Sequence, residues 1–281
     1  MKVRVSIIQM DIAHGDVEVN RRKASKLIGK AGQWESDIVL LPELWSTGYA
    51  LEKLPKIAEP LEGETVGMLR RLAEEYDMYI IGSIAERRNG KFYNTVPVVA
   101  PEGVVGAYSK MHLFELMDEP KYFTAGDSPG IVDTKFGRIG VAICYDLRFP
   151  ELFRILALKG VKAVFIPAEF PNLLDHWRCM LYARAVENQI FIVAANRVGR
   201  WGKFNFFGHS VAITPQGEVL VEAGVSEILL TCNLDFKAVD KARRKIFHLK
   251  HRKPRIYRQL VNTLSLIHIS EPTRPLYISY A

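Results

Sequence analysis

The sequence predicts an α/β fold built from layers of sheet and helix. Short β-rich runs alternate with helix-length segments, and many of these runs are apolar throughout. Continuous apolar strands are typical of sheets that are covered on both faces. No linker, repeat or change in composition interrupts residues 1–258. We therefore predict one domain over residues 1–260, a length that can bury a full core.

The predicted strands are rich in valine and isoleucine, the residue types that favour β structure. In chain order they cover residues 3–10, 37–41, 79–85, 95–100, 104–108, 138–143, 163–166, 190–195, 210–214, 218–222 and 227–233. Several of them end just before a charged or reactive side chain. In open α/β sheets the carboxyl ends of the strands are where sites form.

The predicted helices lie between these strands and carry their apolar residues on one face. They cover residues 16–32, 65–76, 150–159, 176–188 and 236–246. The helix at 150–159 has the clearest limits, because Pro150 suits a first turn and Gly160 suits a left-handed cap. Helices packed outside the strand-rich segments complete a layered domain.

The last residues of the chain differ from the rest. From Leu264 onward the sequence is punctuated by Ser and Pro and has neither a strand nor a helix pattern. We predict that residues 261–281 are a non-native extension or a disordered tail, and we leave them out of the fold.

The charge pattern argues against a nucleic-acid partner. The net charge is +7, but ten lysines and arginines lie between residues 237 and 258, beside the single acid Asp240. One basic run is more typical of a solvated helix and its exit than of a nucleic-acid surface. No segment reaches the length of a membrane span, and no signal-peptide pattern opens the chain. We predict a cytoplasmic protein without a membrane partner.

The three cysteines, Cys144, Cys179 and Cys232, do not suggest disulfides. The count is small and odd, and no Cys-x-x-Cys pair is present, which also argues against a zinc ribbon. The seven histidines form no ligand cluster. We expect no metal and no cofactor.

Cys144 ends an apolar strand, and a helix is predicted to begin a few residues later. A side chain at such a turn is presented outward, as in nucleophile elbows, and nearby backbone N–H groups can receive an oxyanion. A helix N-terminus close by is expected to lower the pKa of the thiol. The alternative is a buried cysteine that only fills space at the end of a strand.

Two further polar side chains follow strands in the same way. Glu43 comes after Pro42, which cannot continue a central ladder, so this carboxylate is placed at the edge of the sheet as a candidate general base. Lys110 follows the run 104–108, where it could stabilise a thiolate and a tetrahedral intermediate. Taken singly, each is as well explained by a solvated loop residue.

Together, the three residues and their contexts resemble the nitrilase, or carbon–nitrogen hydrolase, superfamily. The catalytic Glu, Lys and Cys of that family match Glu43 in LPEL, Lys110 in YSKMHLF and Cys144 in GVAICYDLRFPE, and RAVEN, GHS and TPQGEVL match as well. The resemblance covers residues 1–258. It implies a four-layer αββα sandwich, an αββα-αββα homodimer or higher homo-oligomer, and a thioester acyl-enzyme mechanism without metal.

The resemblance implies two more parts of the catalytic site. The family has a second glutamate after the lysine, which matches Glu119 in LMDEPKYFTAGD, with Asp118 as the competing register. It also uses the backbone N–H that follows the cysteine as part of the oxyanion hole, here that of Tyr145.

Within the family, KMHLF, CYDLRFPEL and DHW resemble the omega-amidase branch, and more narrowly the 2-oxoglutaramate amidases. The implied substrate is a small-molecule amide that carries a carboxylate, which needs a cation at a fixed distance from the nucleophile. Arg148 is the candidate for this cation, unless it pairs with Glu151 or Asp146; Arg178 and Arg197 come next. Tyr145, Phe170 and Trp177 are candidate pocket walls, or else core aromatics.

Two other functions fit the same residues. Another carbon–nitrogen hydrolase, such as an N-carbamoyl amidohydrolase or a nitrilase, would keep Glu43, Lys110 and Cys144. A non-catalytic binding protein on this scaffold would not need the three together. We therefore expect an amidase of the omega-amidase type.

Overall fold

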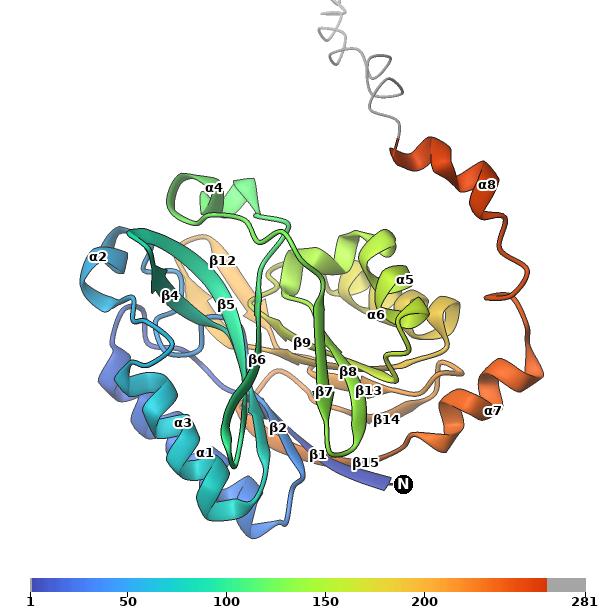
Figure 1. Ribbon diagram of the computed structural model, residues 1–281. Helices are drawn as coiled ribbons and strands as arrows, with labels where there is room; N and C mark the ends of the chain where they lie inside the picture. The colour runs from blue at the N-terminus through green and yellow to red at the C-terminus, as the bar shows by residue number, and fades with distance from the viewer. Residues whose placement is uncertain (1, 262–281) are drawn as a thin grey trace, which may run out of the picture. The chain divides into compact units, whose positions relative to one another are not determined.

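The computed structural model describes residues 2–261 (Figure 1). Its contacts divide the chain into two compact units, the first ending at Arg243 and the second beginning at Arg244. All the strands belong to the first unit. The domain limit at residue 260 stays a prediction. The predicted tail, residues 261–281, lies outside the described residues except for Val261.

The first sheet has seven strands, and its centre is parallel. β1, β2 and β3 run parallel to one another, and every other pairing in this sheet is antiparallel. β6 pairs with β5 beside the main path. The order along that path is β15 (Ile228–Asp235), β1 (Lys2–Gln9), β2 (Ile38–Leu40), β3 (Tyr79–Ile81), β5 (Lys91–Ala100) and β4 (Ile84–Arg88), with β6 at Gly103–Ser109.

The second sheet has six strands and repeats this plan. Its central strands β8, β9 and β10 are parallel. β7 and β13 are antiparallel to their central neighbours β8 and β10, and β14 at the edge is antiparallel to β13. The order is β14 (Val219–Glu222), β13 (Val211–Ile213), β10 (Phe191–Asn196), β9 (Ala163–Ala168), β8 (Gly137–Val141) and β7 (Gly130–Thr134). A separate hairpin joins β11 (Val198–Trp201) to β12 (Phe204–Phe207).

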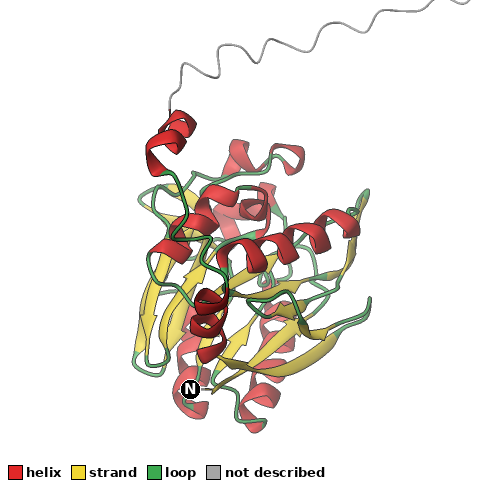
Figure 2. Ribbon diagram, turned by 90° about the vertical axis from the view of Figure 1, so that its right-hand side faces the viewer, coloured by secondary structure: helices red, strands yellow, loops and turns green. Residues whose placement is uncertain are grey.

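Long helices cover the outer faces of both sheets (Figures 1 and 2). α1 (Val17–Gln33) and α3 (Glu64–Tyr76) pack on the first sheet, and α5 (Pro150–Leu158) and α6 (Leu174–Asn188) pack on the second. The shorter helices are α2 (Leu54–Ile57), α4 (Glu119–Tyr122), α7 (Lys237–Lys245) and α8 (Pro254–Tyr257), with 3-10 turns at Leu51–Lys53, Glu115–Met117, Cys144–Arg148 and Arg258–Val261.

The core follows from the alternation of side chains along β1. Val5 and Ile7 point toward the second sheet, where they share a cluster with Val141 and Phe165. Ile8 points the other way, into a cluster that contains residues of α1 and α3. Both sheets are thus buried on two faces, which explains why their strands read as continuous apolar runs.

The strand expected over residues 79–85 is in fact two strands, β3 and β4. A side chain at Gly82 would lie 2.7 Å from the Leu41 Cβ atom, so the chain passes close to the end of β2 here. Ser83 then leaves the ladder, and its hydroxyl accepts a hydrogen bond from the Leu44 backbone N–H at 2.7 Å. Three strands, β7, β11 and β12, were not predicted, because they are short and only partly apolar.

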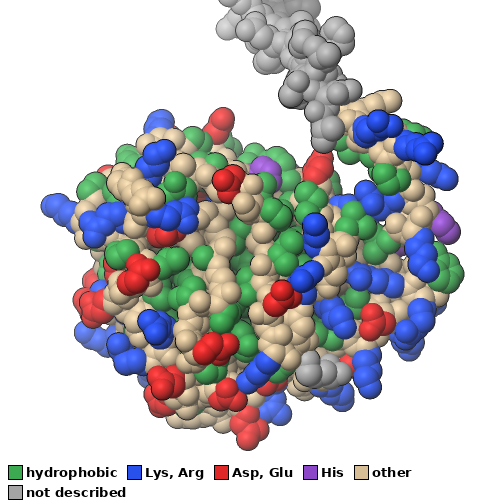
Figure 3. Space-filling view, viewed as in Figure 1, with side chains coloured by type: hydrophobic (Ala, Val, Ile, Leu, Met, Phe, Trp, Pro, Cys, Tyr) green, Lys and Arg blue, Asp and Glu red, His purple; other side chains and the backbone are tan. Residues whose placement is uncertain are grey.

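The basic run lies on α7 and α8 and the segment between them. Figure 3 shows lysine and arginine side chains spread along these helices, and Lys241, Lys245 and Arg255 are exposed. No helix within residues 2–261 is long and apolar enough to cross a membrane.

Candidate active site

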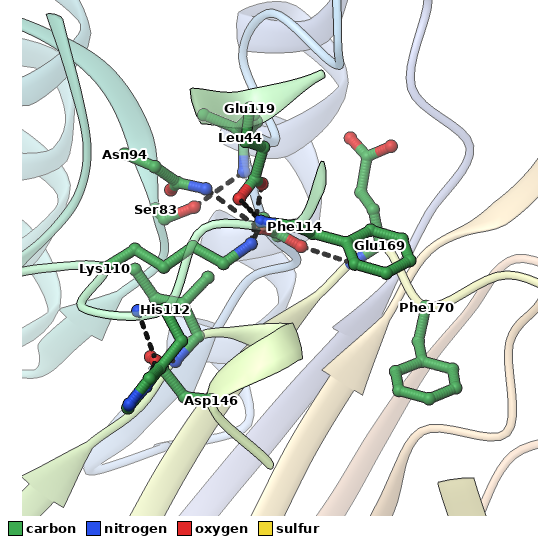
Figure 4. A network of polar contacts seen from close by, with 12 residues as sticks. Leu44, Ser83, Asn94, Lys110, His112, Phe114, Glu119, Asp146, Glu169 and Phe170 are labelled. Carbon is green, nitrogen blue, oxygen red and sulfur yellow. Dashed lines mark hydrogen bonds and ion pairs between the residues drawn. The ribbon is translucent and has the colours of Figure 1, made fainter. Parts of the chain in front are cut away.

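The predicted catalytic residues meet where several strands end. Glu43 follows β2, Lys110 follows β6 and Cys144 follows β8, and Glu119 opens the short helix α4. In Figure 4 the side chains of Lys110, Asn94 and Glu119 converge on one point from different elements. All three predicted catalytic residues and Glu119 are buried, with Cys144 the most accessible at 5% exposure.

Glu43 is held by donors on both of its carboxylate oxygens. Its Oε1 atom accepts hydrogen bonds from Lys110 Nζ at 2.8 Å, Asn94 Nδ2 at 2.8 Å and Tyr49 OH at 3.0 Å. Its Oε2 atom accepts one from the Glu169 backbone N–H at 2.9 Å. A buried carboxylate needs such donors, because it has lost its hydration.

Lys110 sits between two carboxylates. Its Nζ atom lies 2.8 Å from Glu43 Oε1 and 2.6 Å from Glu119 Oε1, and none of these side chains is exposed. The two carboxylates hold the pKa of Lys110 above its usual range, against the opposing effect of burial. Lys110 is therefore a fixed positive charge between Glu43 and Glu119. Asp118, the competing register for Glu119, is exposed and pairs with Lys121 instead.

Cys144 occupies a strained turn. Its φ angle is 41°, a left-handed value that is rare for residues other than glycine and is found at nucleophile elbows and other functional turns. The 3-10 turn that begins at Cys144 leads to α5.

The expected lowering of the thiol pKa is wrong. Burial raises the pKa of Cys144 well above its usual value, the negative charge of Glu43 and a hydrogen bond to it act in the same direction, and Lys110 opposes them. The resting group is thus a thiol, and Glu43 is in hydrogen-bond contact with it.

Asp146 ties the cysteine turn to the lysine segment. Its Oδ2 atom accepts hydrogen bonds from the Ile143 backbone N–H at 2.8 Å and from Tyr108 OH at 2.7 Å. Its Oδ1 atom accepts one from the His112 backbone N–H at 3.1 Å and contacts His112 Nδ1 at 2.7 Å (Figure 4). Tyr108 and His112 flank Lys110, so one buried carboxylate fixes the Cys144 turn and the Lys110 segment relative to each other.

A pocket of about 120 Å³ opens onto Cys144, and its wall is mostly apolar. Tyr145, Arg148 and Phe170 line it, as the sequence predicted. The other lining residues are Phe114, Leu116, Pro171, Asn172, Leu173 and Phe204. Trp177 is not among them and was assigned wrongly: it is fully buried behind Phe170, at 5.3 Å between ring centroids, and donates to the His209 carbonyl oxygen.

Arg148 brings a cation to this pocket without an acidic partner. Its guanidinium lies 5.9 Å from the ring centroid of Tyr145 and 5.4 Å from that of Phe170. Within residues 2–261 it forms neither a hydrogen bond nor an ion pair, because Asp146 is engaged by Tyr108 and His112. The other two candidate cations are occupied, Arg178 by Glu222 and Arg197 by Glu169 and Asp11.

Three residues that donate hydrogen bonds to Glu43 were missed by the sequence reasoning. Glu169 directly follows β9, so the strand-end rule that found Glu43 would also have found it. Asn94 lies inside β5, and Tyr49 lies in the turn after Glu43, where neither periodicity nor spacing marks a residue. No group of three or more His, Cys, Asp or Glu that could hold a metal is present among the described residues.

Comparison with known proteins places these residues in a family. The carbon–nitrogen hydrolase family model matches residues 4–244. A 2-oxoglutaramate amidase of Bacillus subtilis is 39% identical over 249 residues, which are 88% of this chain and 96% of that protein. An omega-amidase of Xenopus laevis is 34% identical over 91% of this chain and 97% of its own length. A solved carbon–nitrogen hydrolase superfamily structure from Xanthomonas campestris superposes with a TM-score of 0.84 at 30% identity, covering 90% of this chain and 98% of that one. The chain belongs to the carbon–nitrogen hydrolase family.

Proposed function

We propose that the protein is an amidase of the omega-amidase type, with Cys144 as nucleophile, Glu43 as general base and Lys110 as electrostatic stabiliser. The observation that supports this most strongly is the buried contact among these residues at the inner end of an open pocket. A buried carboxylate, a fixed cation and a thiol together supply a base, a charge for an oxyanion and a nucleophile.

In the first half of the reaction, Glu43 takes the thiol proton while Cys144 Sγ attacks the amide carbon. The oxygen of the resulting tetrahedral intermediate carries the negative charge, and Lys110 with the Tyr145 backbone N–H would stabilise it. The carbon–nitrogen bond then breaks, the nitrogen takes the proton from Glu43, and ammonia leaves. The acyl group stays on Cys144 as a thioester.

In the second half, Glu43 takes a proton from water as the water oxygen attacks the thioester carbon. The carbon–sulfur bond breaks, the thiolate regains the proton from Glu43, and the acid leaves. Glu119 would hold Lys110 in place through both halves, since its Oε1 atom lies 2.6 Å from Lys110 Nζ. Every step uses groups of this chain and one water.

We infer that the preferred substrate is a short monoamide with a carboxylate at its other end, such as 2-oxoglutaramate. Arg148 supports this, because it lines the pocket and has no acidic partner among the described residues. The apolar wall suits the methylene groups between the two ends. The name of the Bacillus subtilis relative points to the same substrate.

The test is release of ammonia from a panel of amides, carbamoyl compounds and nitriles of matched length. The proposal predicts ammonia and acid from 2-oxoglutaramate, without carbon dioxide. Carbon dioxide from a carbamoyl compound would favour an N-carbamoyl amidohydrolase, and turnover of a nitrile would favour a nitrilase. Absence of all turnover from a folded protein would favour a binding protein on this scaffold.

We also propose a cytoplasmic homodimer. The three cysteines are free, which suits a reducing compartment. α5 and α6 expose apolar side chains, namely Ile155, Leu158, Tyr182 and Val186, and a second copy would cover them. Light scattering should give twice the chain mass, and Val186→Glu should shift it toward the monomer.

A further inference from the structure

Tyr49 lies at the centre of the site without being one of the predicted catalytic residues. It follows a tight turn in which the Gly48 backbone N–H donates to the Leu44 carbonyl oxygen at 2.7 Å. This turn brings the Tyr49 hydroxyl back over Glu43, six residues earlier in the chain. The side chain is buried, with 1% exposure.

The hydroxyl of Tyr49 bridges the two carboxylates of the site. It lies 3.0 Å from Glu43 Oε1 and 2.5 Å from Glu119 Oε1. Both of these oxygens also contact Lys110 Nζ. Two buried carboxylates thus share one cation, and the phenol O–H is a further donor placed between them.

This position has an electrostatic consequence. The pKa of Glu119 is raised above its usual value, chiefly by burial and also by the charge of Glu43, while the charge of Lys110 and the hydrogen bonds from Lys110 and Tyr49 oppose the rise. Burial and the neighbouring carboxylates raise the pKa of Tyr49 itself well above its usual value, so the hydroxyl keeps its proton and remains a donor. The charged and titratable groups that face Tyr49 are Glu43, Lys110, Glu119, Cys144 and Glu169.

The ring of Tyr49 is supported from the hairpin β11–β12. Trp201 stacks on it with 6.3 Å between ring centroids, and Trp201 in turn stacks on His14 at 4.9 Å. The hydroxyl is therefore held by the ring packing as well as by its acceptors, so its direction is set before substrate binds.

We infer that Tyr49 is a positioning residue that fixes the Glu43 and Glu119 carboxylates relative to each other and holds the Glu43 carboxylate against the Cys144 thiol. This inference rests on the proposed function of Glu43 and Cys144. Tyr49 does not line the pocket, and it acts through the two carboxylates that its hydroxyl contacts.

The test compares Tyr49→Phe with the wild type in two measurements over a range of pH. One is the rate at which iodoacetamide alkylates Cys144, followed by mass spectrometry, and the other is ammonia release from 2-oxoglutaramate. A hydrogen bond to a charged group accounts for about ten- to a hundred-fold in rate. We expect kcat to fall by that factor with little change in KM. The acid limb of both pH profiles should move to higher pH, because the carboxylates lose a donor.

The matched control is Tyr79→Phe. Tyr79 is also buried, and its hydroxyl accepts a hydrogen bond from the Lys135 backbone N–H at 3.1 Å, away from the site. This variant should be less stable than the wild type, because a buried contact is lost, but both of its pH profiles should match those of the wild type. A second probe, 2,3-difluorotyrosine at position 49, keeps the shape of the side chain and makes the hydroxyl a stronger donor. It should move the acid limb to lower pH.

The outcomes separate the two claims. If the wild type releases no ammonia, the proposed substrate fails, while the alkylation profiles still test Tyr49. If Tyr49→Phe folds and keeps the wild-type profile and kcat, the inference is overturned. If Tyr49→Phe does not fold, the protein with 2,3-difluorotyrosine at position 49 serves as the test. An acid limb at the same pH as in the wild type would then overturn the inference. Opposite shifts in the two variants would support it.

Discussion

Lys110 Nζ lies 2.8 Å from Glu43 Oε1, and both side chains are fully buried. Two buried opposite charges interact more strongly than two at the surface, but each has lost its hydration. Removing Lys110 leaves two buried carboxylates without their cation, whereas removing Glu43 leaves Lys110 paired with Glu119 alone. The pair is therefore costly to assemble and is expected to be retained for chemistry rather than for stability.

Glu43→Gln should keep the shape of the site and remove the base. General-base catalysis contributes about 10²- to 10⁴-fold, so kcat for ammonia release should fall at least by the lower figure. Circular dichroism should remain that of the wild type. Near-normal turnover in this variant would mean that another group accepts the thiol proton.

Arg148→Met should remove the preference for a carboxylate. In the wild type, kcat/KM for 2-oxoglutaramate should exceed that for its neutral methyl ester, since a charged hydrogen bond contributes about 1.5–3 kcal/mol. In the variant the two values should converge. Arg178→Met, at an arginine paired with Glu222, is the control and should retain the preference. A wild type that does not distinguish acid from ester would refute carboxylate recognition, and an Arg148→Met variant that still distinguishes them would move the role elsewhere.

Asp146→Asn should loosen the nucleophile turn. The new amide N–H groups would face donors that now bond to the carboxylate. These are the Ile143 N–H and the Tyr108 O–H at one oxygen, or the His112 N–H at the other. We expect slower alkylation of Cys144 and a lower melting temperature. Asp133→Asn, at an exposed aspartate paired with Arg138, is the control and should change neither. Wild-type alkylation in Asp146→Asn would show that the turn is held by other contacts.

Glu169 should make stability fall as pH rises. Burial raises its pKa from 4.5 to about 7, although Arg197 opposes this. The folded protein therefore binds this proton more tightly than the unfolded chain does. The associated stability is present below the unfolded value of 4.5 and is lost as pH rises to about 7, at a limit of about 1.4 kcal/mol per pH unit.

The measurement is the urea midpoint of wild type and Glu169→Gln at several pH values between 4.5 and 7. The wild type should lose stability relative to the variant over this range. The difference in unfolding free energy between the two proteins should therefore change steadily with pH. Glu102→Gln, at an exposed glutamate, controls for the loss of one surface charge. Parallel curves for wild type and Glu169→Gln would contradict the raised pKa.

The sequence was informative wherever a strand led directly to a polar residue. Glu43, Lys110 and Cys144 each follow an apolar run, and the structure brings all three together. Tyr49 and Asn94 could not be predicted, because their roles depend on contacts between segments distant in sequence. Trp177 was misplaced because an aromatic residue on a helix gives no sign of whether it faces a pocket or the core.

The direction of the Cys144 pKa shift could not be predicted from the sequence, for a related reason. Proximity to a helix start can be seen in the sequence, but the burial of the thiol and its contact with Glu43 depend on the packing of two sheets. The same limit applies to residues 79–85, where the close approach of Gly82 to Leu41 divides one apolar run into two strands.

The central claim is that Cys144 carries the acyl group, and an acid-quenched reaction with 2-oxoglutaramate tests it most directly. Peptide mass spectrometry should find the acyl mass on Cys144 and on neither Cys179 nor Cys232, and Cys144→Ala should release no ammonia while keeping the wild-type fold. Ammonia release by a folded Cys144→Ala variant, or an acyl group on another residue, would contradict the account.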